Sequence, residues 1–323
     1  MLDQFQRQIE YLRISVTDRC NLRCRYCMPS EGVQWMPHDD ILSFEEILRL
    51  MRLSTQIGFR RFRITGGEPL VRRGILDLLR EGAQLPGVED FMLTTNGMLL
   101  PEMAFQLKAA GVQRVNISLD TMDPERFRDI SRGGDVQTVI QGIFRALEAG
   151  LNPVKLNVVV VRGFNTEELP NFLALASRYP LHVRFIELMP IGISSEHRSD
   201  FVPVKEMKEI LGIREYVPTQ DIPGGGPAEN FRPSGFKGSI GFISALSRHF
   251  CETCNRVRLT VDGKLRPCLQ SKHEVDLRAA LRDGSSDAEI LDLFAKATWH
   301  KPVEHHMNDE AWQGTRSMSQ IGG

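Results

Sequence analysis

Hydrophobic and polar positions along the chain predict short buried strands that alternate with amphipathic helices. One helix is expected over residues 43–58, where apolar residues recur at helical spacing, Ser43 and Glu46 form a capping box and Gly58 ends the segment. Apolar, β-branched runs predict six strands, at residues 11–16, 61–65, 90–94, 114–119, 154–161 and 182–188. Helical segments between such strands are typical of repeated βα units, which build a parallel sheet.

The number of these units predicts an α/β fold of the incomplete (β/α)6 type, a TIM-like barrel that stays open, because a closed barrel needs eight units. Pattern alone separates this fold poorly from a doubly wound sheet, which is the alternative. We expect the partial barrel over residues 1–215. A C-terminal region over residues 216–323 is expected to carry a β-hairpin and to close the barrel.

The C-terminal region differs in composition from the βα units. Residues 219–235 are rich in Gly and Pro and predict a loop across the surface or across a mouth of the barrel. Residues 255–269 predict two strands joined at Asp262-Gly263, which is a strong hairpin signal. The closing segment 316–323, "RSMSQIGG", is short and ends in two glycines, so we expect no helix there.

Overall composition is that of an ordinary globular protein, without features of a nucleic-acid or membrane surface. The 323 residues are 41% hydrophobic and 25% charged, with a formal net charge of -1. A nucleic-acid surface normally carries net positive charge. The first residues contain no apolar leader core, and no run of about 18 apolar residues occurs. We therefore expect a cytoplasmic protein, in which clustered thiols stay reduced and available to metals.

All six cysteines fall in two triads, and the first triad follows the first predicted strand. It comprises Cys20, Cys24 and Cys27, with the spacing C-x3-C-x2-C. Soft thiolate ligands favour zinc or iron-sulfur clusters. A structural zinc site usually has four protein ligands, whereas three cysteines on a four-iron cluster leave one iron able to bind another molecule. The position after a strand, where such barrels place their active sites, favours a cluster over packed or zinc-bound thiols.

The second triad, Cys251, Cys254 and Cys268, accompanies the predicted hairpin. Its spacing, C-x2-C-x13-C, again leaves one iron of a cluster without a protein ligand. Zinc is a stronger alternative here, because His249 could complete a site of three thiolates and one imidazole. The residues alone leave the choice between zinc and an iron-sulfur cluster open.

Cationic residues lie inside four of the predicted strands, although parallel strands covered by helices are normally apolar. These residues are Arg13, Arg63, Lys155 and Arg184. Buried cations need partners, and Asp120 and Glu187 are the candidate carboxylates. If the four side chains face inward, they form a cage for a polyanion such as a triphosphate. Arg256 and Arg258 alternate on the first hairpin strand, so their side chains point the same way.

The first triad, the aromatic Tyr26 before its last cysteine, and "TGGEP" at residues 65–69 together resemble the radical S-adenosylmethionine superfamily. This resemblance implies a 4Fe-4S cluster whose open iron binds the amino acid part of S-adenosyl-L-methionine. The reduced cluster would cleave that cofactor to a 5′-deoxyadenosyl radical. Gly66 and Gly67 suit such a site, since glycine permits close approach to the backbone.

Longer motifs extend nearly from end to end and resemble the GTP 3′,8-cyclase family of molybdenum cofactor biosynthesis. They are "YLRISVTDRCNLRCRYCMP", "RFRITGGEPLVRR", "LTTNG", "VNISLD", "RFIELMPIG", "CETCNRVRLTVDGKLRPCL" and the final Gly322-Gly323. One departure is Gln6, at a position that is often Gly in the family. The resemblance implies the partial barrel, a second 4Fe-4S cluster in place of zinc, and a cavity between the two clusters.

Matching motifs assign roles that the resemblance implies for individual residues. The first triad holds the S-adenosylmethionine cluster, and the second triad holds the other. The expected S-adenosylmethionine contacts are Tyr26, Gly67, Ser118 and Met189. The expected GTP contacts are Arg13, Arg63, Thr94, Lys155, Arg184, Arg256 and Arg258. The expected catalytic residues are Arg256, Arg258, Gly322 and Gly323. The resemblance also suggests that the diglycine tail inserts into the active site.

The implied activity is a lyase reaction that converts GTP to (8S)-3′,8-cyclo-7,8-dihydroguanosine 5′-triphosphate, the first step of molybdenum cofactor biosynthesis. It starts with hydrogen abstraction from the 3′ carbon of the ribose. The reaction implies an external one-electron donor of the flavodoxin or ferredoxin type. The product could be handed directly to cyclic pyranopterin monophosphate synthase. The oligomeric state could be that of a monomer or of a homodimer.

Other functions are weighed against this one. A peptide-modifying radical S-adenosylmethionine enzyme would share the first triad and "TGGEP", but it would have no need of an interior triphosphate cage. A zinc-bound scaffold protein would be colourless, whereas iron-sulfur proteins are brown. A GTP-binding regulator would be expected to carry a phosphate-binding loop, and no "GxxxxGK[ST]" occurs in the sequence.

Overall fold

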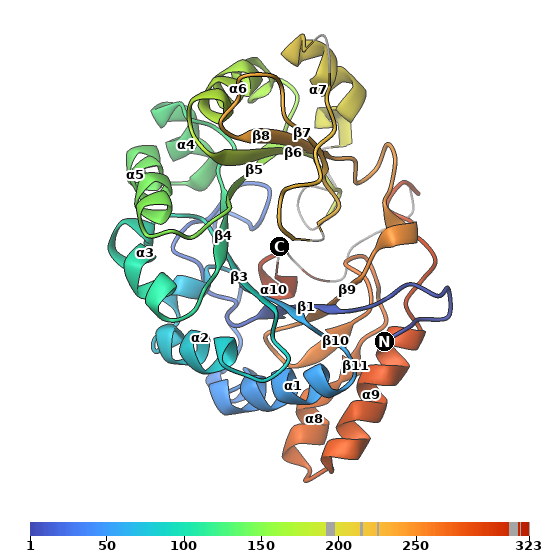
Figure 1. Ribbon diagram of the computed structural model, residues 1–323. Coiled ribbons are helices and arrows are strands. Elements are labelled where there is room, and N and C mark those ends of the chain that lie inside the picture. The colour runs from blue at the N-terminus through green and yellow to red at the C-terminus, as the bar shows by residue number, and fades with distance from the viewer. Residues whose placement is uncertain (192–197, 214–215, 225, 310–315, 317, 323) are drawn as a thin grey trace.

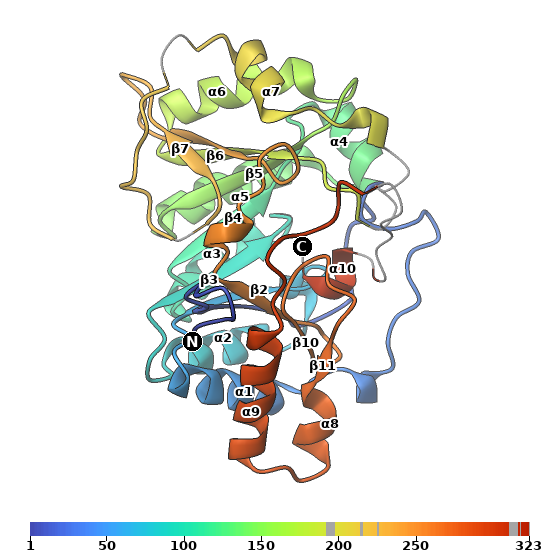
Figure 2. The same cartoon turned by 90° about the vertical axis from the view of Figure 1, so that its right-hand side faces the viewer.

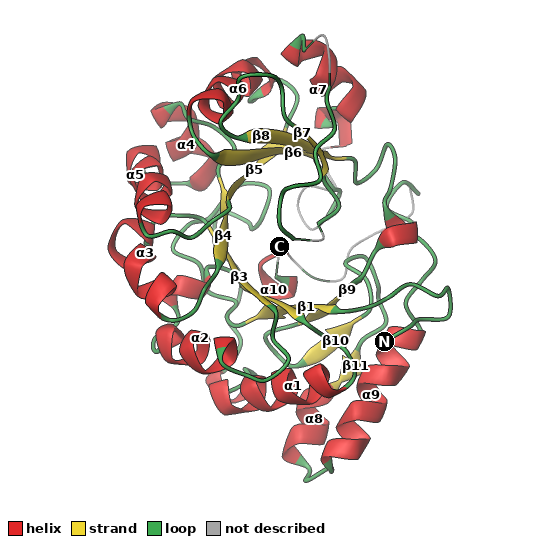
Figure 3. Ribbon diagram, in the orientation of Figure 1, coloured by secondary structure: helices red, strands yellow, loops and turns green. Residues whose placement is uncertain are grey.

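The computed structural model describes residues 1–323 apart from 192–197, 214–215, 225, 310–315, 317 and 323. In this part of the chain eleven strands form one sheet, in the order β11-β10-β9-β1-β2-β3-β4-β5-β6-β8-β7. The strands are β1 (Tyr11–Ser15), β2 (Arg61–Thr65), β3 (Asp90–Thr95), β4 (Arg114–Ser118), β5 (Val154–Val160), β6 (Leu181–Glu187), β7 (Glu229–Phe231), β8 (Ser239–Ile243), β9 (Arg256–Leu259), β10 (Lys264–Arg266) and β11 (Val275–Asp276). Figures 1 and 3 show the sheet curved into an arc.

Neighbouring strands run parallel from β9 through β1 to β6 and on to β8, whereas β7, β10 and β11 pair antiparallel at the two ends. The strand order has two ends, β11 and β7, so over the described residues the sheet does not close on itself. This confirms the predicted open α/β barrel and excludes a closed one. Strands from both sides of residue 215 share the sheet, and the boundary between the two predicted regions stays a prediction.

Helices cover the outer face of the arc, and Figure 1 shows α1 to α6 outside the strands. The helices are α1 (Phe44–Gln56), α2 (Ile75–Ala83), α3 (Leu100–Ala109), α4 (Pro124–Ser131), α5 (Val136–Glu148), α6 (Leu169–Arg178), α7 (Val204–Leu211), α8 (Leu277–Arg282), α9 (Asp287–Trp299) and α10 (Met318–Ile321). Helix α1 begins as predicted, because the Ser43 hydroxyl accepts from the Glu46 N–H and the Glu46 carboxylate accepts from the Ser43 N–H.

The two faces of the parallel strands differ in polarity. In β1, Leu12 and Ile14 are fully buried in the core between sheet and helices. Tyr11 and Arg13 alternate with them and therefore face the interior of the arc. The interior face is thus polar, which explains how cationic residues occur in strands that are otherwise apolar.

Two expectations for the C-terminal region were wrong. Residues 318–321 form the short helix α10, although the sequence favoured a tail without a helix. Tertiary packing stabilises it, since Ile321 is buried against Ile191 and Met307. The Gly/Pro-rich segment also contains a strand, because β7 pairs with β8 at the edge of the sheet. Figure 1 shows α10 inside the arc of strands.

The N-terminal turn contains the residue that departs from the family pattern. Gln6 has φ 61°, a left-handed conformation that favours glycine. Its N–H donates to the carbonyl of Asp3, which closes the turn at 3.1 Å. The chain therefore adopts at Gln6 the backbone that a glycine would adopt more easily. Figure 2 shows this end of the chain above α9, viewed at 90° to Figure 1.

Candidate active site

The first cysteine triad follows β1 and lines a cavity at the carboxyl edge of the sheet. Cys20, Cys24 and Cys27 contribute to one wall, together with Tyr26 and Gly67. The turn between the last two thiols is closed by the Cys27 N–H, which donates to the Cys24 carbonyl at 2.9 Å. Burial raises the pKa of Cys24 well above its ordinary value and that of Cys27 to about 12. Burial therefore disfavours the free thiolate form of both residues, as it does for buried cysteines in general.

The glycines after β2 place this loop against the sheet. A Cβ atom on Gly67 would lie 2.3 Å from the Arg19 carbonyl oxygen, and one on Gly66 would lie 2.6 Å from that of Thr17. The Gly67 N–H donates to the Thr17 carbonyl at 2.7 Å. The two glycines are therefore required for packing of the cysteine loop itself, as well as for the cavity that Gly67 lines.

Glu68, the acidic residue of "TGGEP", holds the end of β3 in place. Its carboxylate accepts from the Thr95 hydroxyl at 2.8 Å and from the Asn96 N–H at 2.7 Å. Burial raises its pKa to about 7, although the Asn96, Leu70 and Thr95 donors act in the opposite direction. Glu68 thus acts as a structural link between β2 and β3.

All four residues expected to contact S-adenosylmethionine lie on the first cavity. They are Tyr26, Gly67, Ser118 and Met189. The Tyr26 hydroxyl donates to Asp120 at 2.6 Å, and the same carboxylate accepts from the Val159 N–H. Burial raises the pKa of Asp120 to about 6 and that of Tyr26 well above its ordinary value. Tyr26 and Asp120 therefore form a buried pair that fixes the cysteine loop to the ends of β4 and β5.

A second cavity adjoins the first and is lined by arginines. The cavity residues expected to contact GTP are Arg13, Arg63, Thr94, Arg184, Arg256 and Arg258. Thr94, Ser118 and Met189 line both cavities, so the two are continuous. Arg256 and Arg258 both face the interior, as their alternation on β9 predicts.

Buried nitrogens in this second cavity point to an anionic ligand. The Nε atoms of Arg63, Arg184 and Arg256, and the Thr94 hydroxyl, have no hydrogen-bond partner among the described residues. Arg63 is only 7% exposed and Arg184 only 5%. Buried cationic donors without partners are costly, and a bound polyphosphate would satisfy several of them at once.

Lys155 belongs to the same cationic group but lies beside the cavity and not on its wall. Its ammonium donates to the Pro223 carbonyl at 2.6 Å, in the Gly/Pro-rich segment. Burial, and then the charges of Arg184, Arg114 and Arg63, lower its pKa to about 6. The unliganded protein therefore holds Lys155 mostly neutral near pH 7.

The carboxylates expected to pair with these cations have other partners. Asp120 binds Tyr26, as described above. Glu187 lies at the end of β6 and accepts from the backbone N–H groups of Val204, Leu246 and Ser247. Both follow the ends of strands, where backbone donors of the next loop are closer than side chains from the middle of the sheet. The expected pairing was therefore wrong, and the cage keeps its positive charge.

The second triad lies around β9 and β10, as the hairpin predicts. Cys251 begins a short 3-10 turn (Cys251–Thr253), Cys254 precedes β9, and Cys268 follows β10. Burial alone would raise the pKa of Cys254, but the positive charges of Arg256 and Lys301 lower it to about 6. A thiolate favoured at neutral pH fits a metal ligand.

His249, the fourth zinc ligand considered above, makes another contact. Its Nε2 lies 3.0 Å from the Glu304 carboxylate, while its buried Nδ1 has no partner in the described part of the chain. Within the described residues, no three His, Cys, Asp or Glu side chains are arranged around a point where a single metal ion could bind. The positions of these side chains therefore favour neither zinc nor an iron-sulfur cluster at the second triad.

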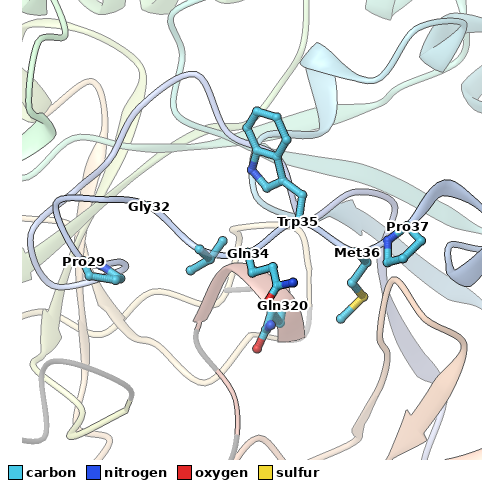
Figure 4. Close-up of a pocket in the computed structure, with 8 residues that line it drawn as sticks. Pro29, Gly32, Gln34, Trp35, Met36, Pro37 and Gln320 are labelled. Atoms are coloured by element: carbon cyan, nitrogen blue, oxygen red, sulfur yellow. The ribbon is translucent and has the colours of Figure 1, made fainter.

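The C-terminal tail enters the interior between the two triads. Met318 lines both cavities, and Ser319 lines the first and donates its N–H to the Cys27 sulfur. Arg258 donates to the Gly322 carbonyl at 2.6 Å, whereas Gly323 lies outside the described residues. On the outer side, Gln320 lines a surface pocket with residues 29–37, the segment that follows the first triad (Figure 4).

Sequence reasoning missed several residues that line the second cavity. Tyr11 lies beside Arg13 on β1, with its ring 5.3 Å from the Arg63 guanidinium. Asn157 accepts from the Arg184 guanidinium at 2.6 Å. A polar residue in the middle of the apolar run 154–161 is the same kind of signal as the strand cations, and it could have identified Asn157. Phe250 offered no comparable signal, because its place depends on the path of a loop.

Comparison with known proteins defines the class of this fold and site. The family model of the radical SAM superfamily matches residues 14–176, and a model described as Molybdenum Cofactor Synthesis C matches residues 181–307. The open parallel sheet and the cysteine loop at its carboxyl edge agree with the first match. Together these features define a radical S-adenosylmethionine enzyme.

Curated relatives identify the family within this class. The chain is 54% identical to a GTP 3′,8-cyclase of Moorella thermoacetica and 53% identical to one of Heliobacterium modesticaldum, with 100% of each chain covered. The chain belongs to the GTP 3′,8-cyclase family. Among solved structures, SuiB of Streptococcus suis bound to S-adenosylmethionine matches with a TM-score of 0.59 at 14% identity, over 89% of this chain and 65% of that one, which concerns the fold alone.

Helix lengths and apolarity were also compared with the needs of a membrane span. No helix in the described residues is long and apolar enough to cross a bilayer.

Proposed function

We propose that this chain converts GTP to (8S)-3′,8-cyclo-7,8-dihydroguanosine 5′-triphosphate, the first step of molybdenum cofactor biosynthesis. The observation that carries this proposal is the second cavity, where the buried Nε atoms of Arg63, Arg184 and Arg256 have no hydrogen-bond partner among the described residues, and which is continuous with the cavity of the first cysteine triad. A triphosphate in the arginine cavity would place its ribose toward Thr94, Ser118 and Met189, which belong to both cavities.

The chain's residues hold the reactants, and the cofactor supplies the radical. We assign Cys20, Cys24 and Cys27 to a 4Fe-4S cluster, because the three residues line one cavity and have the spacing C-x3-C-x2-C. When bound, that cluster and S-adenosyl-L-methionine would supply the radical chemistry needed at the ribose 3′ carbon. Tyr26, fixed by Asp120, orients the cluster loop.

The arginine cage has a positioning role in this proposal. Arg63, Arg184 and Arg258 are buried and bind the phosphates, which fixes the ribose relative to the first cavity. Arg258 also binds the Gly322 carbonyl, so the tail and the substrate meet at the same guanidinium.

We also propose that the second triad holds a 4Fe-4S cluster rather than zinc. Cys251 and Cys254 come just before β9 and Cys268 just after β10, so the hairpin carries all three cysteines, and the positive charges of Arg256 and Lys301 favour the thiolate of Cys254. An open iron facing the arginine cavity would give the guanine base a binding position.

The reaction also needs an electron source and a product acceptor. We propose a small electron-transfer protein of the flavodoxin or ferredoxin type as the donor, since the chain's own residues supply no electron. A hand-off to cyclic pyranopterin monophosphate synthase is the proposed fate of the product. Size-exclusion chromatography with light scattering would distinguish a monomer from a homodimer.

The proposed function is tested with anaerobically reconstituted protein, dithionite, S-adenosylmethionine and GTP, followed by mass spectrometry. Deoxyadenosine together with an isomer of GTP of unchanged mass is the expected result. Deoxyadenosine with GTP untouched would favour the peptide-modifying alternative. Neither product, from brown protein with a full complement of iron, would contradict the proposal.

A further inference from the structure

Lys301 is a buried cation that the proposed reaction does not use directly. Its side chain is only 2% exposed, although lysine is rarely buried without a partner of opposite charge. Among the described residues, no carboxylate lies within ion-pair distance of its ammonium. The charge is therefore held in the interior by something other than a salt bridge.

Hydrogen bonds of Lys301 place its ammonium between the segments that carry the second triad. The Nζ atom donates to the Arg256 carbonyl at 2.9 Å and to the Pro267 carbonyl at 2.7 Å. Arg256 comes two residues after Cys254, and Pro267 comes directly before Cys268. One side chain thus links both cysteine-bearing ends of the β9–β10 hairpin.

A second buried cation links the remaining cysteine to the same segment. Arg7 donates to the Cys251 carbonyl at 2.9 Å and to the Pro302 and Val303 carbonyls at 2.6 and 2.9 Å. Its own charge is balanced by Asp3, which lies 2.6 Å from its Nε. Arg7 therefore has a carboxylate partner in Asp3, whereas Lys301 has none among the described residues.

The balance of charge around the triad indicates what neutralises Lys301. The Lys301 ammonium lies within hydrogen-bonding reach of the Cys254 sulfur, and Cys251 is close enough to interact with the same charge. A cluster held by three thiolates is anionic, and hydrogen bonds and nearby charge set its reduction potential. The negative charge of such a cluster would therefore pair with the buried ammonium of Lys301.

From this arrangement we infer that Lys301 is a positioning residue of the second centre: its ammonium fixes the ligand segments of Cys254 and Cys268 and serves as the buried counter-charge of an anionic cluster there. The inference rests on the proposed second cluster. It adds to that proposal a residue outside the cysteine motif, about 30 positions beyond the last cysteine and after α9.

The test uses a full-length chain in which Cys20, Cys24 and Cys27 are replaced by alanine, so that the second triad alone binds iron. Into this parent we introduce Lys301→Met, Lys301→Gln and Lys301→Arg. Lys296→Met is the matched control, because Lys296 lies on α9 with a side chain that is 61% exposed. Three quantities are measured: iron per chain, the rate of iron loss to a chelator, and the reduction midpoint by electron paramagnetic resonance.

Lys301→Met should lose iron about tenfold faster than the parent, and its midpoint potential should be lower, because removal of a buried cation disfavours the reduced, more negative cluster. Lys301→Gln keeps donors for the two carbonyls without the charge, so it should retain iron better than the methionine variant but show the same lowered potential. Lys301→Arg should stay near the parent in potential, and Lys296→Met should equal the parent in both readouts.

Parent-like iron loss and parent-like potential in Lys301→Met would overturn the inference. If that variant fails to fold by circular dichroism, the potential of Lys301→Gln decides in the same way. A parent chain that binds zinc or no iron would instead refute the proposed second cluster, and the inference with it. The two failures are distinguishable, because the first leaves iron bound to the parent.

Discussion

Replacement of Lys155 by methionine tests whether the arginine cavity binds a polyanion. Lys155 is 6% exposed, and burial together with the charges of Arg184, Arg114 and Arg63 lowers the pKa of its ammonium to about 6, while Asp90 acts in the opposite direction. A triphosphate would favour the charged form and raise this pKa. GTP binding should therefore be accompanied by uptake of a proton at Lys155.

The magnitude follows from the pKa. At pH 8, two pH units above a pKa of about 6, nearly all of the lysine is neutral, and protonating it costs about 3 kcal/mol. A charge-assisted contact is worth about 1.5–3 kcal/mol, so at pH 8 most of the gain is offset. The affinity for GTP should therefore rise as the pH falls from 9 toward 6, by up to about tenfold per pH unit. The reason is that the complex binds one more proton than the free protein.

Isothermal titration calorimetry of the reconstituted protein with GTP measures this linkage. Titrations at pH 8 in two buffers of different ionisation enthalpy give the number of protons taken up. A terminal phosphate has a second pKa of about 6 and contributes little at pH 8. A contact of that strength raises the pKa by about 1–2 units, so at pH 8 we expect an uptake of about 0.1–0.6 proton for the unmodified protein and near zero for Lys155→Met. Equal uptake in both proteins, or an affinity that does not change between pH 7 and 9, would refute the reasoning.

Three further variants test other parts of the site. Cys24→Ala should form no deoxyadenosine, as measured by chromatography, and persistent formation would remove Cys24 from the cluster. Arg256→Met should raise the KM for GTP while uncoupled deoxyadenosine formation continues, because its guanidinium lines the second cavity; unchanged cyclisation would remove it from the site. Gly67→Ala should lower the free energy of unfolding by about 2 kcal/mol or more in urea titrations, because its Cβ would lie 2.3 Å from the Arg19 carbonyl; an unchanged midpoint would contradict the packing argument.

Local signals predicted most of the strands, and non-local contacts account for the elements that were missed. The six runs of β-branched residues correspond to β1 to β6 because each is apolar on the side that packs against helices. Strand β8 was missed: its sequence, "SIGFI", is short and has a central glycine, and its partner β6 lies far back in the chain. Helix α10 depends on burial of Ile321 against Ile191, which no local pattern reveals.

Site residues could be predicted from the sequence where a charged side chain lies in a buried strand. They could not be predicted where their position depends on the path of a loop. Arg63 and Arg184 were found because cations in the middle of buried strands need a reason, and both line the second cavity. The expectation that Asp120 and Glu187 pair with the strand cations was wrong. The sequence does not show how far a residue at the end of one strand lies from a residue in the middle of another. Lys301 escaped notice for a related reason, since its contacts with the hairpin depend on how the chain returns after α9.

The central claim is that the ribose of GTP lies next to the first cluster, and transfer of its 3′ hydrogen tests this most directly. GTP labelled with deuterium at the 3′ carbon is incubated with reconstituted protein, S-adenosylmethionine and dithionite, and the deoxyadenosine is examined by mass spectrometry. The account predicts deoxyadenosine that carries one deuterium, together with a cyclised nucleotide that has lost the label. Unlabelled deoxyadenosine formed alongside the cyclised nucleotide would contradict it, because hydrogen would then come from another position.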